Sequence, residues 1–262
     1  MNAKLIDTHC HLTHGRLRNQ LADVLARAAD AGVRRMVCAA GDLDESRAAA
    51  RLADQHEGLT FLAGVHPHEA AGVEGDYLAD LDELLARPRC AAIGEIGLDY
   101  HYDFSPREDQ RRVFAQQLDL AARLGLAVVI HTREAFDDTL SLLGESAVLP
   151  GRVIFHSFTG DDDQARRGLD YGAALSFSGI VTFKKADDVR AAARLVPTDR
   201  MLIETDAPYL SPEPVRRVKT NEPAHVAHVG RFLADLRGMA FDDFAEQTWT
   251  NAERLLPAVA GG

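Results

Sequence analysis

The sequence lacks the features of a disulfide-stabilised or membrane-spanning protein. Its three cysteines, Cys10, Cys38 and Cys90, are an odd number without C-x-x-C spacing, so we expect buried thiols in a reducing compartment. No stretch approaches ~18 consecutive apolar residues, which excludes an obvious membrane helix. No basic segment precedes a short apolar region near residue 1, so we expect no signal peptide and a cytoplasmic protein.

Positive charge is also scarce, because the 262 residues carry a net charge of −11. This charge argues against a protein that coats long nucleic acid through a basic face. It remains compatible with an enzyme that binds a short strand locally, where bound divalent cations would change the field in a cleft. No linker, low-complexity segment or internal repeat interrupts the chain, so we predict one domain over residues 1–262 and no obligate protein partner.

Eight apolar, strand-like runs recur along the chain, separated by segments with helical periodicity such as 21–29, 78–85 and 113–122. The runs cover 5–8, 35–39, 61–65, 91–95, 127–131, 152–156, 173–177 and 201–204. Gly32 and Gly125 follow predicted helices and suit helix C-caps. This alternation predicts a (β/α)₈ TIM barrel, an α/β fold that typically takes ~250 residues. From Phe241 onward we expect a terminal helix packed on the barrel.

A doubly wound open sheet is the competing architecture. Such a sheet usually carries a glycine-rich phosphate loop after its first strand. Here the first run leads into His9-Cys10-His11 instead. The absence of that loop favours the barrel.

Potential metal ligands stand at or just after the carboxyl ends of the apolar runs. His9 and His11 are two residues apart, so an extended chain directs both imidazoles to one side and Cys10 to the other. The other candidates are Glu95, His131, His156 and Asp206. A single histidine in such a place is usually a hydrogen-bonded core residue, but six ligand-type side chains at equivalent points are not explained that way. Barrel enzymes build their active sites at this face.

Four imidazoles and two carboxylates suffice for two metal ions if one carboxylate bridges them. Glu95 is the natural bridge, because it comes from a middle strand between the two groups of histidines. Some barrel hydrolases use a carboxylated lysine instead. The lysines here, Lys4, Lys184, Lys185 and Lys219, do not close the fourth run.

The motifs of the chain resemble those of TatD-family metal-dependent hydrolases, which belong to the amidohydrolase-like TIM barrels. The matching segments are DTHCHL (7–12), GVHPH (64–68), GEIGLDY (94–100), HTREA (131–135), HSFTG (156–160), SGIVTF (178–183), ETDAPYLSP (204–212), NEP (221–223) and NAERL (251–255). The resemblance implies a dinuclear divalent-metal site and deoxyribonuclease activity. It also implies one metal held by His9, His11, Glu95 and Asp206, and another held by Glu95, His131 and His156.

One segment departs from the family pattern. An Arg-Gly-Lys-like run usually precedes NEP, whereas this chain has Val218 where glycine is common. The positive charge survives but backbone freedom is lost, which puts the substrate contacts of this loop in doubt and leaves the metal ligands unaffected.

Two further residues are candidates for substrate binding. His66 ends the third run and could donate to a phosphate oxygen, hold a metal water, or be satisfied by its neighbours. Arg133 offers a bidentate match to phosphate, or it could pair with a nearby acid such as Asp206. Glu204 could orient the site as an outer acid.

These features predict a hydrolase with two divalent ions, Mg²⁺, Mn²⁺ or Zn²⁺, that cleaves phosphodiester bonds of DNA, from single-stranded ends. Asp206 would act as the general base for an activated water molecule. Hydrolysis of a carboxylic ester or amide is the alternative reaction, since the same chemistry serves a carbonyl carbon. A non-catalytic metal-binding barrel is a third possibility, against which the complete ligand set argues.

Overall fold

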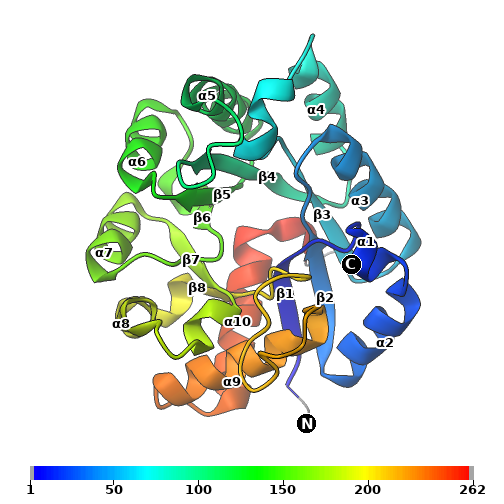
Figure 1. Cartoon of the computed structure of the whole chain (residues 1–262), viewed down its shortest axis with the longest axis vertical. Helices are drawn as coiled ribbons and strands as arrows, with labels where there is room; N and C mark the ends of the chain where they lie inside the picture. Colours follow the sequence, from blue (N-terminus) through cyan, green and yellow to red (C-terminus); the bar gives the residue numbers. More distant parts are fainter. Residues whose placement is uncertain (1–2, 260–262) are drawn as a thin grey trace.

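A computed structural model describes residues 3–259 of the chain. Eight parallel strands form one sheet in sequential order, β1 to β8, and curve into a barrel (Figure 1). The strands are β1 (Leu5–Cys10), β2 (Val33–Cys38), β3 (Leu59–Ala63), β4 (Cys90–Asp99), β5 (Val128–Arg133), β6 (Val153–Phe155), β7 (Ala174–Phe177) and β8 (Met201–Ile203). All eight predicted strands are present, and the prediction of a single-domain TIM barrel is confirmed.

Helices surround the strands and lie in the crossover connections that parallel strands require (Figure 1). The α-helices are α1 (Gly15–Arg18), α2 (Leu21–Asp30), α3 (Leu43–Gln55), α4 (Tyr77–Leu85), α5 (Arg107–Leu124), α6 (Phe136–Glu145), α7 (Asp162–Tyr171), α8 (Asp187–Leu195), α9 (Val226–Leu236) and α10 (Phe241–Leu255). Short 3₁₀ helices are η1 (Pro67–Gly72), η2 (Pro150–Arg152), η3 (Gly179–Thr182), η4 (Thr198–Arg200), η5 (Pro223–His225) and η6 (Pro257–Val259). Gly125 ends α5 with φ 66°, the left-handed conformation that its lack of a Cβ favours.

The first and last strands close the ring through side chains and loops. The Thr8 hydroxyl donates to the carbonyl of Ile203 over 3.0 Å. Beyond the end of β8, the amide of Asp206 donates to the carbonyl of His9 over 2.9 Å. These bonds bring the carboxyl ends of β1 and β8 together, although the regular ladder runs only from β1 to β8 in order.

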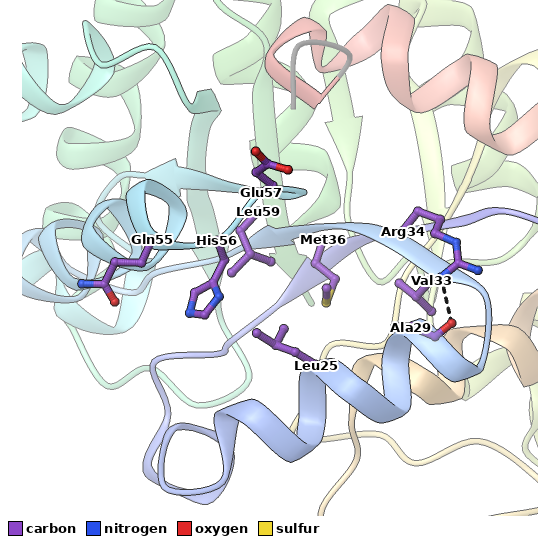
Figure 2. Close-up of a pocket in the computed structure, with 9 residues that line it drawn as sticks. All are labelled: Leu25, Ala29, Val33, Arg34, Met36, Gln55, His56, Glu57 and Leu59. Carbon is purple, nitrogen blue, oxygen red and sulfur yellow. Dashed lines mark hydrogen bonds between the residues drawn. The ribbon is translucent and has the colours of Figure 1, made fainter.

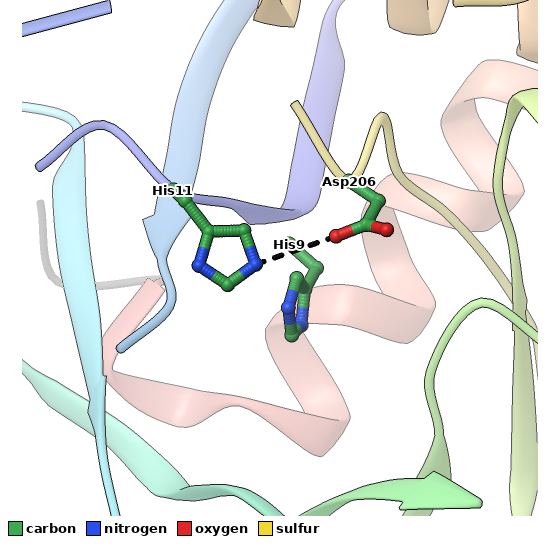
Figure 3. Close-up of side chains that lie close together, drawn as sticks. All are labelled: His9, His11 and Asp206. Carbon is green, nitrogen blue, oxygen red and sulfur yellow. Dashed lines mark ion pairs between the residues drawn. The ribbon is translucent and has the colours of Figure 1, made fainter. Parts of the chain in front are cut away.

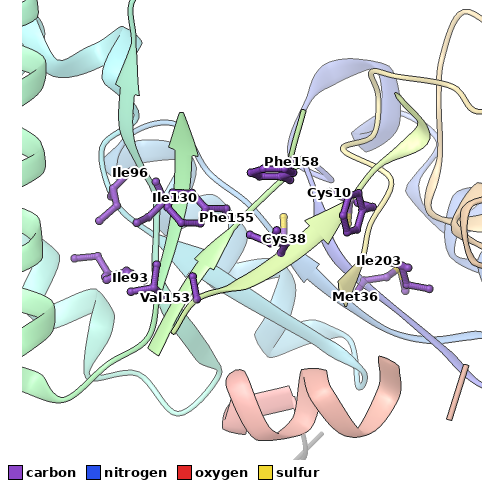
Figure 4. Packing of buried hydrophobic residues seen from close by; sticks show 14 of the residues in the cluster. Cys10, Met36, Cys38, Ile93, Ile96, Ile130, Val153, Phe155, Phe158 and Ile203 are labelled. Carbon is purple, nitrogen blue, oxygen red and sulfur yellow. The ribbon is translucent and has the colours of Figure 1, made fainter. Parts of the chain in front are cut away.

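Two apolar clusters hold the barrel. The larger one lies between strands and helices, and Figure 4 shows part of it, including Ile93, Phe155 and Ile203. The smaller one takes side chains from every strand, among them Ile6, Val37, Leu62, Ala92, Val129, Ile154, Ala174 and Leu202. Leu255, Leu256 and Val259 belong to this inner cluster. The terminal helix therefore does more than cover the barrel: with η6 it packs against the interior and closes one end.

Strand β4 extends further than the sequence indicated. The apolar run ends at Glu95, but the strand continues to Asp99, with an irregularity in its pairing to β5 between Ile93 and Ile96. Glu95 therefore lies within a strand and is 4% exposed.

Other expectations concern helices and thiols. Among residues 3–259, no helix is both long enough and apolar enough to cross a bilayer. The three cysteines are free thiols; Cys10 and Cys38 are buried and Cys90 is half-buried. Cys10 belongs to the larger apolar cluster, between strands and helices, as expected for a packing residue.

Candidate metal centre

His9, in β1, and His11, which follows this strand, face an aspartate that follows β8 (Figure 3). His11 Nε2 lies 3.4 Å from Asp206 Oδ1, and the His9 and His11 ring centroids are 5.2 Å apart. Asp206 has φ 54°, so the chain turns sharply there and presents its carboxylate to the imidazoles. The local backbone is fixed by buried Asp7, which accepts from the amide and hydroxyl of Thr205 over 2.8 and 2.5 Å.

Glu95 is the centre of the cluster. Its Oε2 lies 3.2 Å from His9 Nε2 and 3.8 Å from His11 Nε2. Its Oε1 lies 3.0 Å from His131 Nδ1 and 2.8 Å from His156 Nε2. The two oxygens of one carboxylate thus face two different pairs of histidines. All six side chains predicted as metal ligands are brought together at the carboxyl-terminal mouth of the barrel.

The charge of Glu95 is sustained by its neighbours. Burial alone would raise the pKa of this carboxyl, but the positive charge of nearby imidazoles, His156 foremost, holds it well below the ordinary value. Conversely, burial would lower the pKa of His156, but Glu95 and Glu204 raise it well above the ordinary value. The centre therefore keeps a buried negative charge that requires positive charge beside it.

Glycines allow β4 to approach β5 closely enough for this geometry. Gly97 has φ 141°, and a Cβ at this position would lie 1.9 Å from the carbonyl oxygen of His131. A Cβ at Gly94 would lie 2.8 Å from Val129. The GEIG segment thus carries Glu95 on a strand that can pack tightly against the strand carrying His131.

A second layer of carboxylates orients two of the histidines. His156 Nδ1 donates to Glu204 Oε1 over 3.2 Å, which leaves Nε2 directed at Glu95. His131 Nε2 donates to Asp99 Oδ2 over 3.1 Å, which leaves Nδ1 directed at Glu95. Metal-ligating histidines typically have such a partner on the second ring nitrogen. The sequence suggested this orienting role for Glu204 but not for Asp99. The position of Asp99, four residues after Glu95, could have indicated it.

His66 also lies in the cluster, with Nε2 3.4 Å from Glu95 Oε1. Burial lowers its pKa to about 4, so the ring is neutral at neutral pH. Its Nδ1 accepts from the amide of His68 over 3.1 Å, so its single proton must sit on Nε2. Although its position is compatible with a metal ligand, this tautomer makes His66 a hydrogen-bond donor.

Arg133 lies apart from the ligand cluster. Its guanidinium stacks over the ring of Tyr102 at 4.8 Å. Within residues 3–259 it makes no ion pair, so the expected alternative of a pairing with Asp206 is not seen. It lines a cavity of about 290 Å³ that His156 also reaches. Another cavity, lined by Leu25, Met36 and Leu59 among others, lies at the opposite end of the strands (Figure 2).

The donor set fits a divalent cation. Among the described residues, His9 Nδ1 is a buried polar atom without a hydrogen-bond partner, which is unfavourable unless a ligand or ion satisfies the ring. Ligand atoms of His9, His11 and Asp206 lie within 4.8 Å of one another, as do those of His9, Glu95 and His156. Mixed imidazole and carboxylate ligands suit several divalent metals.

Comparison with known proteins agrees with this arrangement. The family model described as TatD related DNase matches residues 6–257. The chain belongs to the TatD-related DNase family. The membership covers nearly the whole barrel, so the prediction of a TatD-family metal-dependent hydrolase is confirmed.

Relatives of this TatD-family chain share its full length. It is 38% identical over 251 residues to YabD of Bacillus subtilis, named an uncharacterized metal-dependent hydrolase, covering 96% of this chain and 98% of the relative. It is 35% identical over 256 residues to TatD of Escherichia coli, named a 3'-5' ssDNA/RNA exonuclease, covering 96% and 98%. The crystal structure of the TatD homologue YjjV from Escherichia coli matches with a TM-score of 0.92 and 30% identity, covering 98% and 99%.

Proposed function

We propose that this protein is an exonuclease that removes nucleotides from single-stranded DNA ends with two divalent ions. The observation that carries the proposal is the division of the Glu95 carboxylate oxygens between two groups of histidines. Its Oε2 faces His9 and His11, and its Oε1 faces His131 and His156. A carboxylate whose two oxygens face different groups of ligands can bridge two ions. The name of the Escherichia coli relative, a 3'-5' ssDNA/RNA exonuclease, supports the nucleic-acid substrate and the attack from an end.

The same division supports the two ligand sets that the family resemblance implies. One ion would be held by His9, His11, Glu95 and Asp206, and the other by Glu95, His131 and His156. The ions could be Mg²⁺, Mn²⁺ or Zn²⁺. When bound, they would act as Lewis acids that polarise the phosphate and acidify a water molecule.

The side chains of the protein supply the proton transfers and the orientation. Burial alone would raise the pKa of Asp206, but His11 holds it below its ordinary value, so the carboxylate is charged and can accept the proton of the attacking water. His66, fixed as an Nε2–H donor by the amide of His68, can donate to a non-bridging phosphate oxygen. Arg133, at the edge of the mouth, can pair with a neighbouring phosphate.

Charge supports a substrate bound over a short length. A net charge of −11 provides no extended basic surface along a duplex. A free single-stranded end can enter the barrel mouth directly, whereas a duplex end would first have to be unpaired. A cytoplasmic location and the absence of an obligate protein partner stay predictions.

The test uses purified protein on three substrates: a single-stranded oligonucleotide labelled at one end, a closed circular plasmid, and a carboxylic ester. We expect a ladder of stepwise shortened oligonucleotides, abolished by chelator and restored by a divalent metal. Asp206→Asn is the matched inactive control. Rapid internal cutting of the plasmid would contradict exonuclease action, and turnover of the ester alone would replace the phosphodiesterase assignment.

A further inference from the structure

The mouth of the barrel carries exposed aromatic rings. Within residues 3–259, the substantially exposed aromatic side chains are Tyr102, Phe104 and Tyr209, which are 48, 67 and 45% exposed. Tyr102 and Phe104 follow β4, and Tyr209 follows β8, so each stands beyond the carboxyl end of a strand that contributes to the candidate metal centre. Exposed aliphatic side chains such as Leu149 occur elsewhere, but the exposed aromatic rings of the described residues gather at this one face, which indicates a ligand there.

Tyr102 and Phe104 form a pair. Their ring centroids are 5.2 Å apart with an interplanar angle of 19°, an offset stack. Arg133 covers the Tyr102 ring, and the His68 ring meets Phe104 edge-on with centroids 4.7 Å apart. Two stacked rings, one cation and one imidazole thus form a continuous surface beside the site, which we call the aromatic platform.

The loop that carries the platform is held by hydrogen bonds. Asp99 Oδ1 accepts from the amides of His101 and Tyr102 over 3.0 and 2.9 Å. The buried Gln110 side-chain amide donates to the carbonyls of Asp99 and Ser105 over 3.1 and 2.9 Å. The rings are therefore placed before any ligand arrives, which lowers the entropy cost of binding.

A short chain of contacts joins the platform to the candidate metal centre. His68 Nε2 lies 2.9 Å from Asp99 Oδ2, and the same oxygen accepts from His131 Nε2 over 3.1 Å. His131 in turn contacts Glu95. The platform is thus separated from the Glu95 cluster by a single carboxylate and a single imidazole layer, so one substrate strand can touch both.

We propose that the aromatic platform is a stacking subsite for an unpaired nucleobase of the substrate strand, with Tyr102 and Phe104 as specificity-determining residues. This inference rests on the proposed nuclease function. In an acidic protein without an extended basic surface, base stacking can add binding to the few phosphate contacts at the site. Stacking on aromatic side chains is worth about 1–3 kcal/mol per base and is tolerant of sequence. Bases within a duplex are already stacked on both faces, so the platform favours single strands.

The experiment is a double-mutant-type cycle with the metal-loaded full chain. One axis is Phe104→Ala, and the other replaces the bases near the cleaved end of a single-stranded oligonucleotide by abasic sites. We expect Phe104→Ala to raise KM for the normal oligonucleotide about fivefold or more, with kcat retained, and to leave KM for the abasic oligonucleotide unchanged. Phe104→Trp should keep the wild-type KM. Leu149→Ala, which alters a side chain that is 65% exposed at the opposite end of the barrel, is the matched control.

Two results would overturn the subsite: an unchanged KM in both Phe104→Ala and Tyr102→Ala, or equal losses on normal and abasic strands, which would indicate a structural role. A second readout uses an uncleavable single-stranded oligonucleotide carrying 2-aminopurine, whose fluorescence is quenched on stacking. Quenching that depends on Phe104, without nucleotide release from cleavable strands, would refute the nuclease and retain the base-binding subsite. Nucleotide release together with quenching that is independent of Tyr102 and Phe104 would refute the base-binding subsite and retain the nuclease.

Discussion

The two ends of the barrel are built on opposite principles. At the carboxyl end several buried groups are charged, among them Glu95, Asp99 and Glu204. At the amino end, the apolar side chains of Leu255, Leu256 and Val259 close the interior. Burying carboxylates is unfavourable unless charge and hydrogen bonds compensate, whereas apolar burial stabilises directly. The fold therefore separates stability from chemistry along the barrel axis.

This separation predicts the largest functional effect at Glu95. We expect Glu95→Ala to abolish turnover and to lose more than one equivalent of bound metal, because the side chain faces both histidine pairs. His9→Ala and His131→Ala should each lose chiefly one ion. Metal content per chain, with a thermal melt to verify folding, measures this. Retention of two equivalents in Glu95→Ala would show that the carboxylate does not bridge.

Asp206→Asn should follow in size. The amide oxygen can still coordinate a metal, but the amide cannot accept a proton at neutral pH. We expect kcat to fall by ~10²–10⁴-fold, with at least one ion retained at saturating metal. Turnover near the wild-type rate with full metal would place the base elsewhere, and Glu204 or His66 would be tested next.

The amino end should show the converse behaviour. Leu255→Ala removes a 3% exposed side chain from the inner cluster and should lower the free energy of unfolding by about 2–5 kcal/mol. Its kcat at a temperature where the variant is folded should equal that of the wild type. Denaturant unfolding and initial rates on one preparation give both values, and a parallel loss of kcat would break the separation of the two ends.

A smaller effect is expected from the outer carboxylates. Glu204→Ala removes the partner of His156 Nδ1, and loss of such a partner typically weakens metal affinity by about 10–100-fold. Glu204→Gln keeps an acceptor and should lose less. Metal titration followed by restored activity compares the two variants. Equal affinity in Glu204→Ala and wild type would show that packing alone orients His156.

The smallest effect is expected at Val218. Its side chain is 45% exposed, its carbonyl accepts from the Ser211 hydroxyl over 2.7 Å, and its φ is not positive. The backbone there does not require glycine, so the departure from the family pattern causes no strain. Val218→Gly should change the free energy of unfolding by less than about 1 kcal/mol. A large change in KM would instead show that loop flexibility governs substrate contacts.

Prediction from sequence succeeded for features that depend on local periodicity or on the position of a residue at the end of a strand. The eight apolar runs located the strands, and the position of ligand-type residues at their ends brought His9, Glu95 and Asp206 to one mouth. It missed what depends on contacts between distant segments. The extension of β4 to Asp99 depends on packing against β5, and the tautomer of His66 depends on a hydrogen bond from His68. The inner position of Leu255 was also missed, because the helical periodicity of the terminal segment fits a helix on the surface of the barrel equally well.

The closure between β1 and β8 has a consequence for the order of folding. Thr205 donates to Asp7 across 198 residues of sequence, and contacts of such separation form late because loop closure costs entropy first. The pairing of His11 with Asp206 depends on the same closure. A chain still being synthesised, before residue 206 has emerged, holds only part of the cluster. The nascent chain therefore lacks Asp206, the proposed general base, until the segment that follows β8 has been made.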